Sequence, residues 1–324
     1  MGKILSFEEY EKASDDSFLS HLFIEFYYGD ENRNFLYIGE SLASTNTLFE
    51  KYGIFDKCLE MSEEIIRKAK GVELKNHSTI TIKMPANNVA KRVVVEYDKD
   101  VFGVTAYAYN ESVFNQNEGL FDEITIIISS KDKLKLSVIM HELQHVKEDC
   151  ELRKKGSSTD KKLEKIGYKK LLVNLPKPSN TMERKLYKLV YLYTSFERNA
   201  YINSIYGELM ESPKKFTTIN AVCNFIKGTG FYQQYEEAFE WTNEFLEIKN
   251  KEDKIKVLYY LGKITNFYFM EYKDVKRWLN AMLYSYKKKF NTIIPKMAYE
   301  VFSEKMSKGL ADSTTMTNYI NSKI

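Results

Sequence analysis

Helix-like and strand-like stretches follow one another in blocks along the chain, and the first block is helical. From about residue 55 to 70, apolar residues recur three and four positions apart, which is the spacing of one face of an amphipathic helix. The residues on this face are Cys58, Met61, Ile65 and Ile66. Nearer the N-terminus, Ser6 and Glu9 form a capping box that predicts the start of another helix. We therefore expect residues 1–75 to be mainly helical.

From Thr79 the pattern changes to the alternation and the β-branched runs that are typical of strands. Four such segments follow one another, over 79–84, 92–97, 104–109 and 123–129. Short polar connections join them, so they predict a small sheet that is either mixed or antiparallel. Two separate hairpins are an alternative that the pattern does not distinguish from one sheet.

The next segment, over 130–155, predicts a helix with two different faces. Ser129 or Ser130 can cap it, and Asp132 would lie in its first turn, where a negative charge suits the helix dipole. One apolar stripe should face the sheet and consists of Leu136, Ile139, Leu143 and Val146. His141 and His145 lie on a second stripe, beside Leu134 and Val138. A pair of ordinary core histidines would be expected on the apolar stripe itself.

The remainder of the chain reads as helical. A short helix is expected over 160–172, followed by a break at Pro176 and Pro178. A long helix is expected over 181–210, and about five further helices beyond Pro213, in a stretch rich in aromatic residues.

The order of these elements predicts an α+β fold. Residues 1–212 would form its core, with the sheet over 79–129 packed on the helix over 130–155. Residues 213–324 would form a large all-α region. A weak boundary near 212–216 leaves open whether that region is a separate domain or packs as part of the same one.

Composition narrows the class of protein. The chain has 324 residues, of which 44% are hydrophobic and 29% charged, as in ordinary folded soluble proteins. Its net charge of +3 is too small to indicate nucleic acid or membrane as a partner. The cysteines, Cys58, Cys150 and Cys223, form no disulfide framework, which favours a reducing compartment. Without a signal-peptide core or a long apolar run, we expect a cytoplasmic protein, and the abundance of Lys, Asn and Tyr is typical of an AT-rich bacterial or phage genome.

The helix over 130–155 carries His141-Glu142-Leu143-Gln144-His145. Residues four apart lie on one face of a helix, about 6 Å apart along its axis, so the two imidazoles can hold one metal ion. Glu142 can then reach a water molecule bound to that ion, as in the H-E-x-x-H motif of zinc metallopeptidases. The alternative is a chance match, which would arise in about one in a hundred proteins with so few histidines. His21 and His77 are expected to be structural or surface residues.

A catalytic zinc ion takes three protein ligands, and the third can be sought by elimination. No histidine follows His145, which excludes the H-E-x-x-H-x-x-G-x-x-H pattern. Asp149 lies about 12 Å along the same helix from His141, which is too far for a shared ion. The third ligand must therefore come from another element, and the long helix over 181–210 offers three glutamates.

Of these, Glu183 is explained by capping at the helix start and Glu208 lies near the helix end. Glu197 is predicted in the middle of the helix, where no residue three or four positions away is basic. A buried carboxylate there would need a cation, and a metal ion is one. We therefore predict His141, His145 and Glu197 as ligands of one Zn²⁺ ion. The alternative for Glu197 is a solvated side chain paired with Arg198 or a distant lysine.

The motif, followed 52 residues after His145 by Glu197-Arg198-Asn199-Ala200-Tyr201, resembles the gluzincin group of zinc metallopeptidases. This resemblance implies a zincin-like core of the thermolysin-like or minigluzincin kind, with a glutamate ligand on a second helix and a small residue, here Ala200, three positions on. It also implies that the strand over 123–129 is an edge strand along which a substrate peptide lies. The chain departs from the family in having Tyr201 where an acidic residue follows the glutamate ligand by four positions.

The chemistry expected of these groups is peptide hydrolysis. Zinc would lower the pKa of a water molecule to about 7, and Glu142 would take its proton and pass it to the leaving amine. Tyr201 or Tyr193 is the expected second donor to the oxyanion, although plain packing explains either tyrosine equally well. A protein or peptide is the expected substrate.

A second hypothesis is a non-catalytic interaction or structural protein built on a zincin scaffold. The aromatic C-terminal helices could form an assembly surface, since such residues are common at interfaces. The presence of Glu142 beside the histidines favours the enzyme, because a scaffold without activity has no use for that base.

Overall fold

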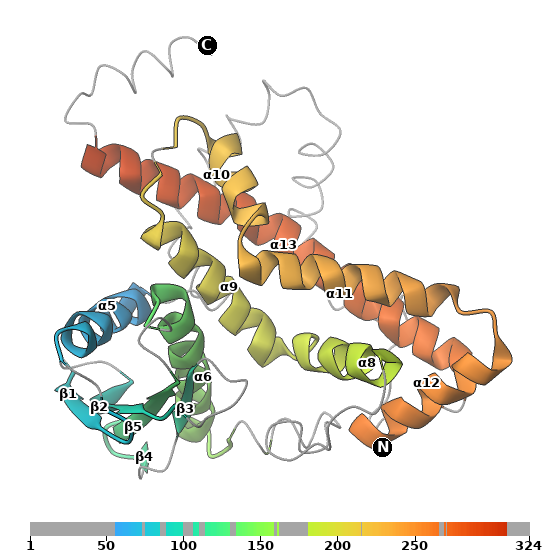
Figure 1. Ribbon diagram of the computed structural model, residues 1–324, viewed down its shortest axis with the longest axis horizontal. Coiled ribbons are helices and arrows are strands. Elements are labelled where there is room, and N and C mark those ends of the chain that lie inside the picture. The colour runs from blue at the N-terminus through green and yellow to red at the C-terminus, as the bar shows by residue number, and fades with distance from the viewer. Residues whose placement is uncertain are drawn as a thin grey trace. The chain divides into compact units, whose positions relative to one another are not determined.

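The computed structural model describes residues 56–72, 75–84, 89–99, 106–109, 114–129, 134–158, 161, 181–214, 216–265, 269 and 271–309 (Figure 1). The predicted helix at Ser6, the breaker at Pro176 and Pro178, and all but one residue of the predicted helix over 160–172 lie outside the described residues, as does His21. No helix among the described residues is long and apolar enough to cross a bilayer.

The fold is α+β, as predicted. A mixed sheet packs on α6, the helix that carries the two histidines, and a large all-helical region follows. The strands are β1 (Thr79–Lys83), β2 (Ala90–Tyr97), β3 (Ala106–Tyr109), β4 (Phe114–Asn115) and β5 (Leu120–Ile128). The helices are α5 (Asp56–Lys70), α6 (Leu136–Lys154), α8 (Thr181–Leu192), α9 (Ser195–Glu211), α10 (Ile219–Lys227), α11 (Gly230–Glu247), α12 (Lys251–Ile264) and α13 (Tyr272–Gly309).

Two compact units divide the chain. One holds residues 56–212 and 229–279 of the described chain, and the other holds 213–228 and 280–309. The first unit therefore combines the sheet and α6 with α11 and α12, which lie beyond residue 212 in the sequence. All residues of the site considered below belong to this unit.

The sheet has the order β1-β2-β5-β3, and β4 pairs with the first residues of β5. The four segments predicted from periodicity are thus strands of one sheet. β5 is parallel to β2 and antiparallel to β3. From Thr125 to Ile128, β5 is paired on both sides, so its main chain has no free edge for a substrate there. The expectation that this segment is an edge strand is therefore wrong, because the short strand β3 lies outside it.

One face of the sheet is apolar and is covered by α5 and α6 (Figure 1). Its buried side chains alternate with more exposed ones along β2 and β5, as expected of a half-buried sheet. They are Ile82, Val93, Val95, Ile124, Ile126 and Ile128. The predicted apolar stripe of α6, which includes Ile139 and Leu143, is buried as well. Burial of this stripe fixes which way the other face of α6 points.

The start of α6 differs from the prediction. The helix begins at Leu136 rather than near Ser130, and its N-cap residue Lys135 makes no side-chain capping bond. Instead, the backbone N–H of Leu136 donates to Oε1 of Glu211, at the end of α9, over 2.7 Å. A neighbouring helix therefore supplies a negative cap at this helix start, whereas Ser130 and Asp132, from which we expected it, lie outside the described residues.

The predicted long helix over 181–210 is two helices, which is a second correction. α8 ends at Leu192, and α9 begins at Ser195 with Thr194 as its N-cap. The Thr194 hydroxyl accepts a hydrogen bond from the backbone N–H of Glu197 over 3.2 Å. Glu197 is therefore in the first turn of α9 and not in the middle of a helix.

Beyond residue 213 the described chain is helical, as predicted, and the helices begin at polar caps. Thr218, Thr229 and Asn250 each accept a backbone N–H from the first turn of α10, α11 and α12 respectively. The Tyr193 ring packs edge-on against Trp278 at 6.4 Å, so aromatic residues of this region contribute to the core. The described residues here hold four helices, where the pattern predicts about five.

Candidate metal centre

Three side chains from α6 and α9 converge on one point. The Nε2 atoms of His141 and His145 are 3.2 Å apart. Oε2 of Glu197 lies 3.5 Å from Nε2 of His141, and Oε1 lies 3.3 Å from Nε2 of His145. Among the described histidines, cysteines and acidic residues, these three form a group that could hold a metal ion. The structure thus brings together the three residues predicted as ligands.

Their spacing is compatible with one shared ion. In a four-coordinate zinc site with bonds of about 2.0–2.1 Å, neighbouring ligand atoms stand about 3.3 Å apart, the edge of the tetrahedron. The two imidazole nitrogens, 3.2 Å apart, match that edge. The two Glu197 distances, 3.5 and 3.3 Å, end on different carboxylate oxygens, so they place the carboxylate against both nitrogens without defining one tetrahedral face. One donor atom from each of the three residues lies within 4.8 Å of the other two.

Burial makes a cation necessary at this point. Glu197 is only 5% exposed, and its Oε2 is buried without a hydrogen bond of good geometry from the described residues. Burial alone would raise the pKa of Glu197, but His145 and His141 hold it well below the usual range. Burial alone would lower the pKa of His145, but the Glu197 charge, helped by Glu142 and Glu148, raises it to about 9. The protein by itself thus favours a protonated His145 against an ionised Glu197, and a bound ion would replace that proton.

The local sequence explains how Glu197 comes to be ionised here. Three residues after the Thr194 cap, its carboxylate lies in the first turn of α9, where the helix dipole stabilises negative charge. The absence of a basic residue three or four positions away therefore does not by itself explain why Glu197 is ionised at the centre. The ligand predicted for a mid-helix position is found at a helix start.

Glu142 belongs to the same cluster of charges. It lies on α6 directly after His141, is half-buried, and its charge helps to raise the pKa of both His145 and Tyr191. The Glu142 charge therefore acts on the same centre as the three candidate ligands.

The two tyrosines expected near the centre lie differently. Tyr201 packs its ring edge-on against His141 at 5.3 Å, but its hydroxyl donates to Gln234 of α11 over 2.8 Å. The Tyr193 hydroxyl is hydrogen-bonded to buried Thr242, in the core, which accounts for this residue by packing.

Tyr191, at the end of α8, was missed from sequence. Burial raises its pKa well above the ordinary value, and the negative charge of Glu197, to which its side chain is hydrogen-bonded, raises it further. Six positions before Glu197, it would lie about 120° away around one continuous helix, but the helix is interrupted between the two residues at Thr194. The break itself was the signal, because Thr194 with Glu197 is a capping pair in the sequence.

A polar network joins α6 and α9 beside the ligands. Oε1 of Glu148 accepts from Nε2 of Gln144 over 2.8 Å and from Nδ2 of Asn199 over 2.6 Å. Nδ2 of Asn203 donates to Oε1 of Gln144 over 2.9 Å and to the Asn199 carbonyl over 3.1 Å. Gln144 and Asn203 are buried, so these bonds favour one register of the two helices.

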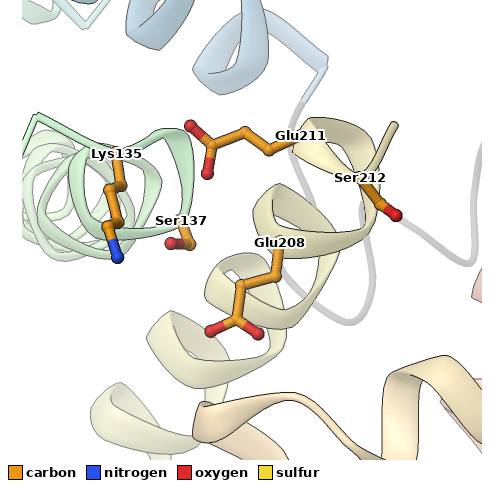
Figure 2. Close-up of a pocket in the computed structure, with 5 residues that line it drawn as sticks. All are labelled: Lys135, Ser137, Glu208, Glu211 and Ser212. Carbon is orange, nitrogen blue, oxygen red and sulfur yellow. The ribbon is translucent and has the colours of Figure 1, made fainter. Parts of the chain in front are cut away.

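A pocket opens farther along the same two helices, where α6 begins and α9 ends (Figure 2). It is lined by Lys135, Ser137, Glu208, Glu211 and Ser212. Glu211 caps α6, and Oε2 of Glu208 accepts the backbone N–H of Gly230, in the first turn of α11, over 3.3 Å. The two carboxylates thus bind the first turns of α6 and α11 to α9, which is a structural role.

His77 lies away from the centre. It is exposed, adopts a left-handed backbone with φ of 59°, and donates its N–H to the Tyr97 carbonyl over 2.7 Å in the turn before β1. It is a turn residue, in line with the structural or surface role expected for it.

Comparison of the chain with protein-family models, with curated proteins and with solved structures gave no match. The chemistry of the centre must therefore be inferred from its own residues.

Proposed function

We propose that the protein is a zinc-dependent metallopeptidase that hydrolyses peptide bonds in a protein or peptide substrate. The observation that carries the proposal is the convergence of His141, His145 and Glu197, with one donor atom from each within 4.8 Å of the others, and with Glu142 next to one ligand in the sequence. Two nitrogens and one carboxylate are a usual ligand set for catalytic zinc, and they leave a fourth position for water.

Glu142 performs the proton transfers in this proposal. Zinc, when bound by the three ligands, supplies a Lewis acid that acidifies water and polarises the scissile carbonyl group. Glu142 takes the proton from the attacking water and later delivers it to the leaving nitrogen. Such general acid–base catalysis typically contributes a factor of about 10² to 10⁴ in rate.

Tyr201 and Tyr191 are the two candidates for a second donor to the developing oxyanion. Tyr201 would first have to leave its hydrogen bond to Gln234, whereas Tyr191 already lies against Glu197. Tyr191→Phe and Tyr201→Phe separate the two roles, because the loss of an oxyanion donor lowers kcat by about 10²–10³ without removing zinc.

The free edge of β3 is our proposal for the substrate strand, in place of β5. Among the described strands, β3 pairs only with β5, so its outer main-chain groups can accept an extended peptide. α6 packs beside this strand, which brings the edge to the side of the sheet where the histidines lie.

Three variants on one helix pair test the proposal. Purified wild-type protein should contain one zinc ion per chain and cleave a denatured protein substrate. Glu142→Gln should keep the zinc and abolish cleavage, and Glu197→Gln should lose zinc affinity. Glu151→Gln is the matched control, since Glu151 is an exposed acid on α6 paired with Lys154, and it should change neither property.

Protein that binds no zinc after chelator-free purification would refute the proposal. Zinc without cleavage of any substrate would instead support the non-catalytic scaffold. We propose a cytoplasmic setting for either, with no nucleic-acid or membrane partner.

A further inference from the structure

His141 has a hydrogen-bond partner on the ring nitrogen that faces away from the centre. Its Nδ1 lies 3.1 Å from Oγ of Ser204, and Ser204 is completely buried. Ser204 is seven residues after Glu197, which is two turns along the same face of α9. One face of α9 therefore carries both a candidate ligand and a partner for another ligand.

The direction of this hydrogen bond follows from counting protons. Oγ of Ser204 donates its one hydrogen to the Ala200 carbonyl, four residues earlier, over 3.0 Å. The hydroxyl can then only accept from His141. Nδ1 of His141 therefore carries a proton, which leaves Nε2, the nitrogen that faces Glu197 and His145, as the atom that could bind an ion.

We infer that Ser204 is a positioning residue for the metal centre, which fixes His141 in the tautomer that can bind an ion through Nε2. The inference rests on the metal site of the proposed function, but not on peptide cleavage. Ser204 also limits rotation of the imidazole, because its oxygen is held in place by the helix backbone. Partners of this kind on ligand histidines typically change metal affinity by about 10–100-fold.

The resemblance to gluzincins points to a different position for this task. There an acidic residue stands four positions after the glutamate ligand, at the place of Tyr201, whose hydroxyl is directed to Gln234. Ser204 lies one turn nearer the end of α9 and offers a neutral oxygen. A neutral hydroxyl attracts the Nδ1 proton of His141 less strongly than a carboxylate would, so the imidazole donates less electron density to the ion.

Two measurements on full-length protein test the inference. Zinc affinity, determined by competition with a chromophoric chelator, should fall about 10–100-fold in Ser204→Ala, which removes the hydroxyl without adding volume at this buried position. Nitrogen NMR of labelled histidine, with and without zinc, should show the proton of His141 on Nδ1.

Ser62→Ala is the matched control. Ser62 is also completely buried, and its hydroxyl donates to the carbonyl four residues earlier, Cys58, but it lies on α5 without a ligand histidine as partner. It reproduces the loss of a buried serine in a helix, and its zinc affinity should stay at the wild-type value.

The inference is overturned if Ser204→Ala binds zinc as tightly as wild type, if Ser62→Ala loses as much affinity, or if Nδ1 of His141 carries no proton. Failure of the proposed function has a different signature. A protein that binds zinc with the expected dependence on Ser204 but cuts no peptide would refute the peptidase alone. If the protein binds no zinc, the metal-free NMR spectrum still shows whether Nδ1 of His141 carries the proton.

Discussion

Gly207 sets the distance between the two helices that carry the ligands, and Gly207→Ala should therefore weaken both folding and metal binding. A Cβ at this position would lie 2.6 Å from Cα and 2.8 Å from N of Ser137. Both atoms are backbone of α6, so they cannot move without the helix. An ordinary contact of 3.4 Å requires the helices to separate by about 0.8 Å at this point.

Overpacking of this kind costs about 1–3 kcal/mol of unfolding free energy. About 1 kcal/mol of unfolding free energy is regained, because alanine is a better helix former than glycine. Gly262→Ala is the control, since Gly262 is also within a helix and a Cβ there would meet nothing within 4 Å. Both variants share the propensity gain, so the difference between them isolates the clash. We expect Gly207→Ala to be less stable than Gly262→Ala by about 2 kcal/mol.

Chemical denaturation of the metal-free proteins measures this difference, and zinc titration measures its effect on the centre. Metal sites tolerate errors of only about 0.2 Å in ligand position. The helices separate by about 0.8 Å at Gly207, so zinc binding would already weaken if a quarter of that displacement reached Glu197 through α9. If Gly207→Ala proved as stable as Gly262→Ala and bound zinc as wild type does, the close approach of α6 and α9 would not position the ligands.

Three further predictions concern the same helices. The raised pKa of His145, about 9 against 6.5, means that the contribution of His145 to the stability of the metal-free protein is full below pH 6.5 and disappears as the pH rises through 9. The lowered pKa of Glu197 means that the contribution of Glu197 to this stability is lost as the pH falls below 4.5. Thermal melts across this pH range should show both losses of stability in wild type and neither in Glu197→Gln. Asn203→Ala should cost about 1–3 kcal/mol in denaturant, because it deprives the buried Gln144 oxygen of its donor, and an unchanged midpoint would show that the network is dispensable. Thr194→Ala should cost about 1 kcal/mol by loss of the α9 cap and should also lower zinc affinity, whereas an effect on stability alone would separate the cap from the position of Glu197.

Elements determined by their own residues were predicted well from the sequence. The period of α5, the alternation along β1, β2 and β5, and the two faces of α6 all depend on side chains within the element. The histidines four apart on α6 required no tertiary information either. For this reason the histidine pair and its strand-and-helix surroundings could be recognised from local pattern alone.

Elements determined by distant residues were predicted poorly. α6 starts at Leu136 because Glu211, 75 residues later, caps it, and no local pattern contains that information. The pairing of β5 with β3 as well as β2 depends on how the chain crosses between them, which periodicity does not report. The break between α8 and α9 is different, since Thr194 and Glu197 form a local capping pair that was read as helix interior.

The face of α9 gives a better physical reason for choosing Glu197 than the lack of a neighbouring base does. A carboxylate can join two histidines of another helix only if the two helices come close, and close approach requires small side chains at the contact. Ala200, Ser204 and Gly207 follow Glu197 at three, seven and ten positions, along one face of α9, and the two with side chains are fully buried. Glu183 has no such row after it, and Glu208 projects beside Gly207 towards the start of α11. The row of small residues therefore identifies the helix face that meets α6, and Glu197 is the one glutamate of the three that lies on it.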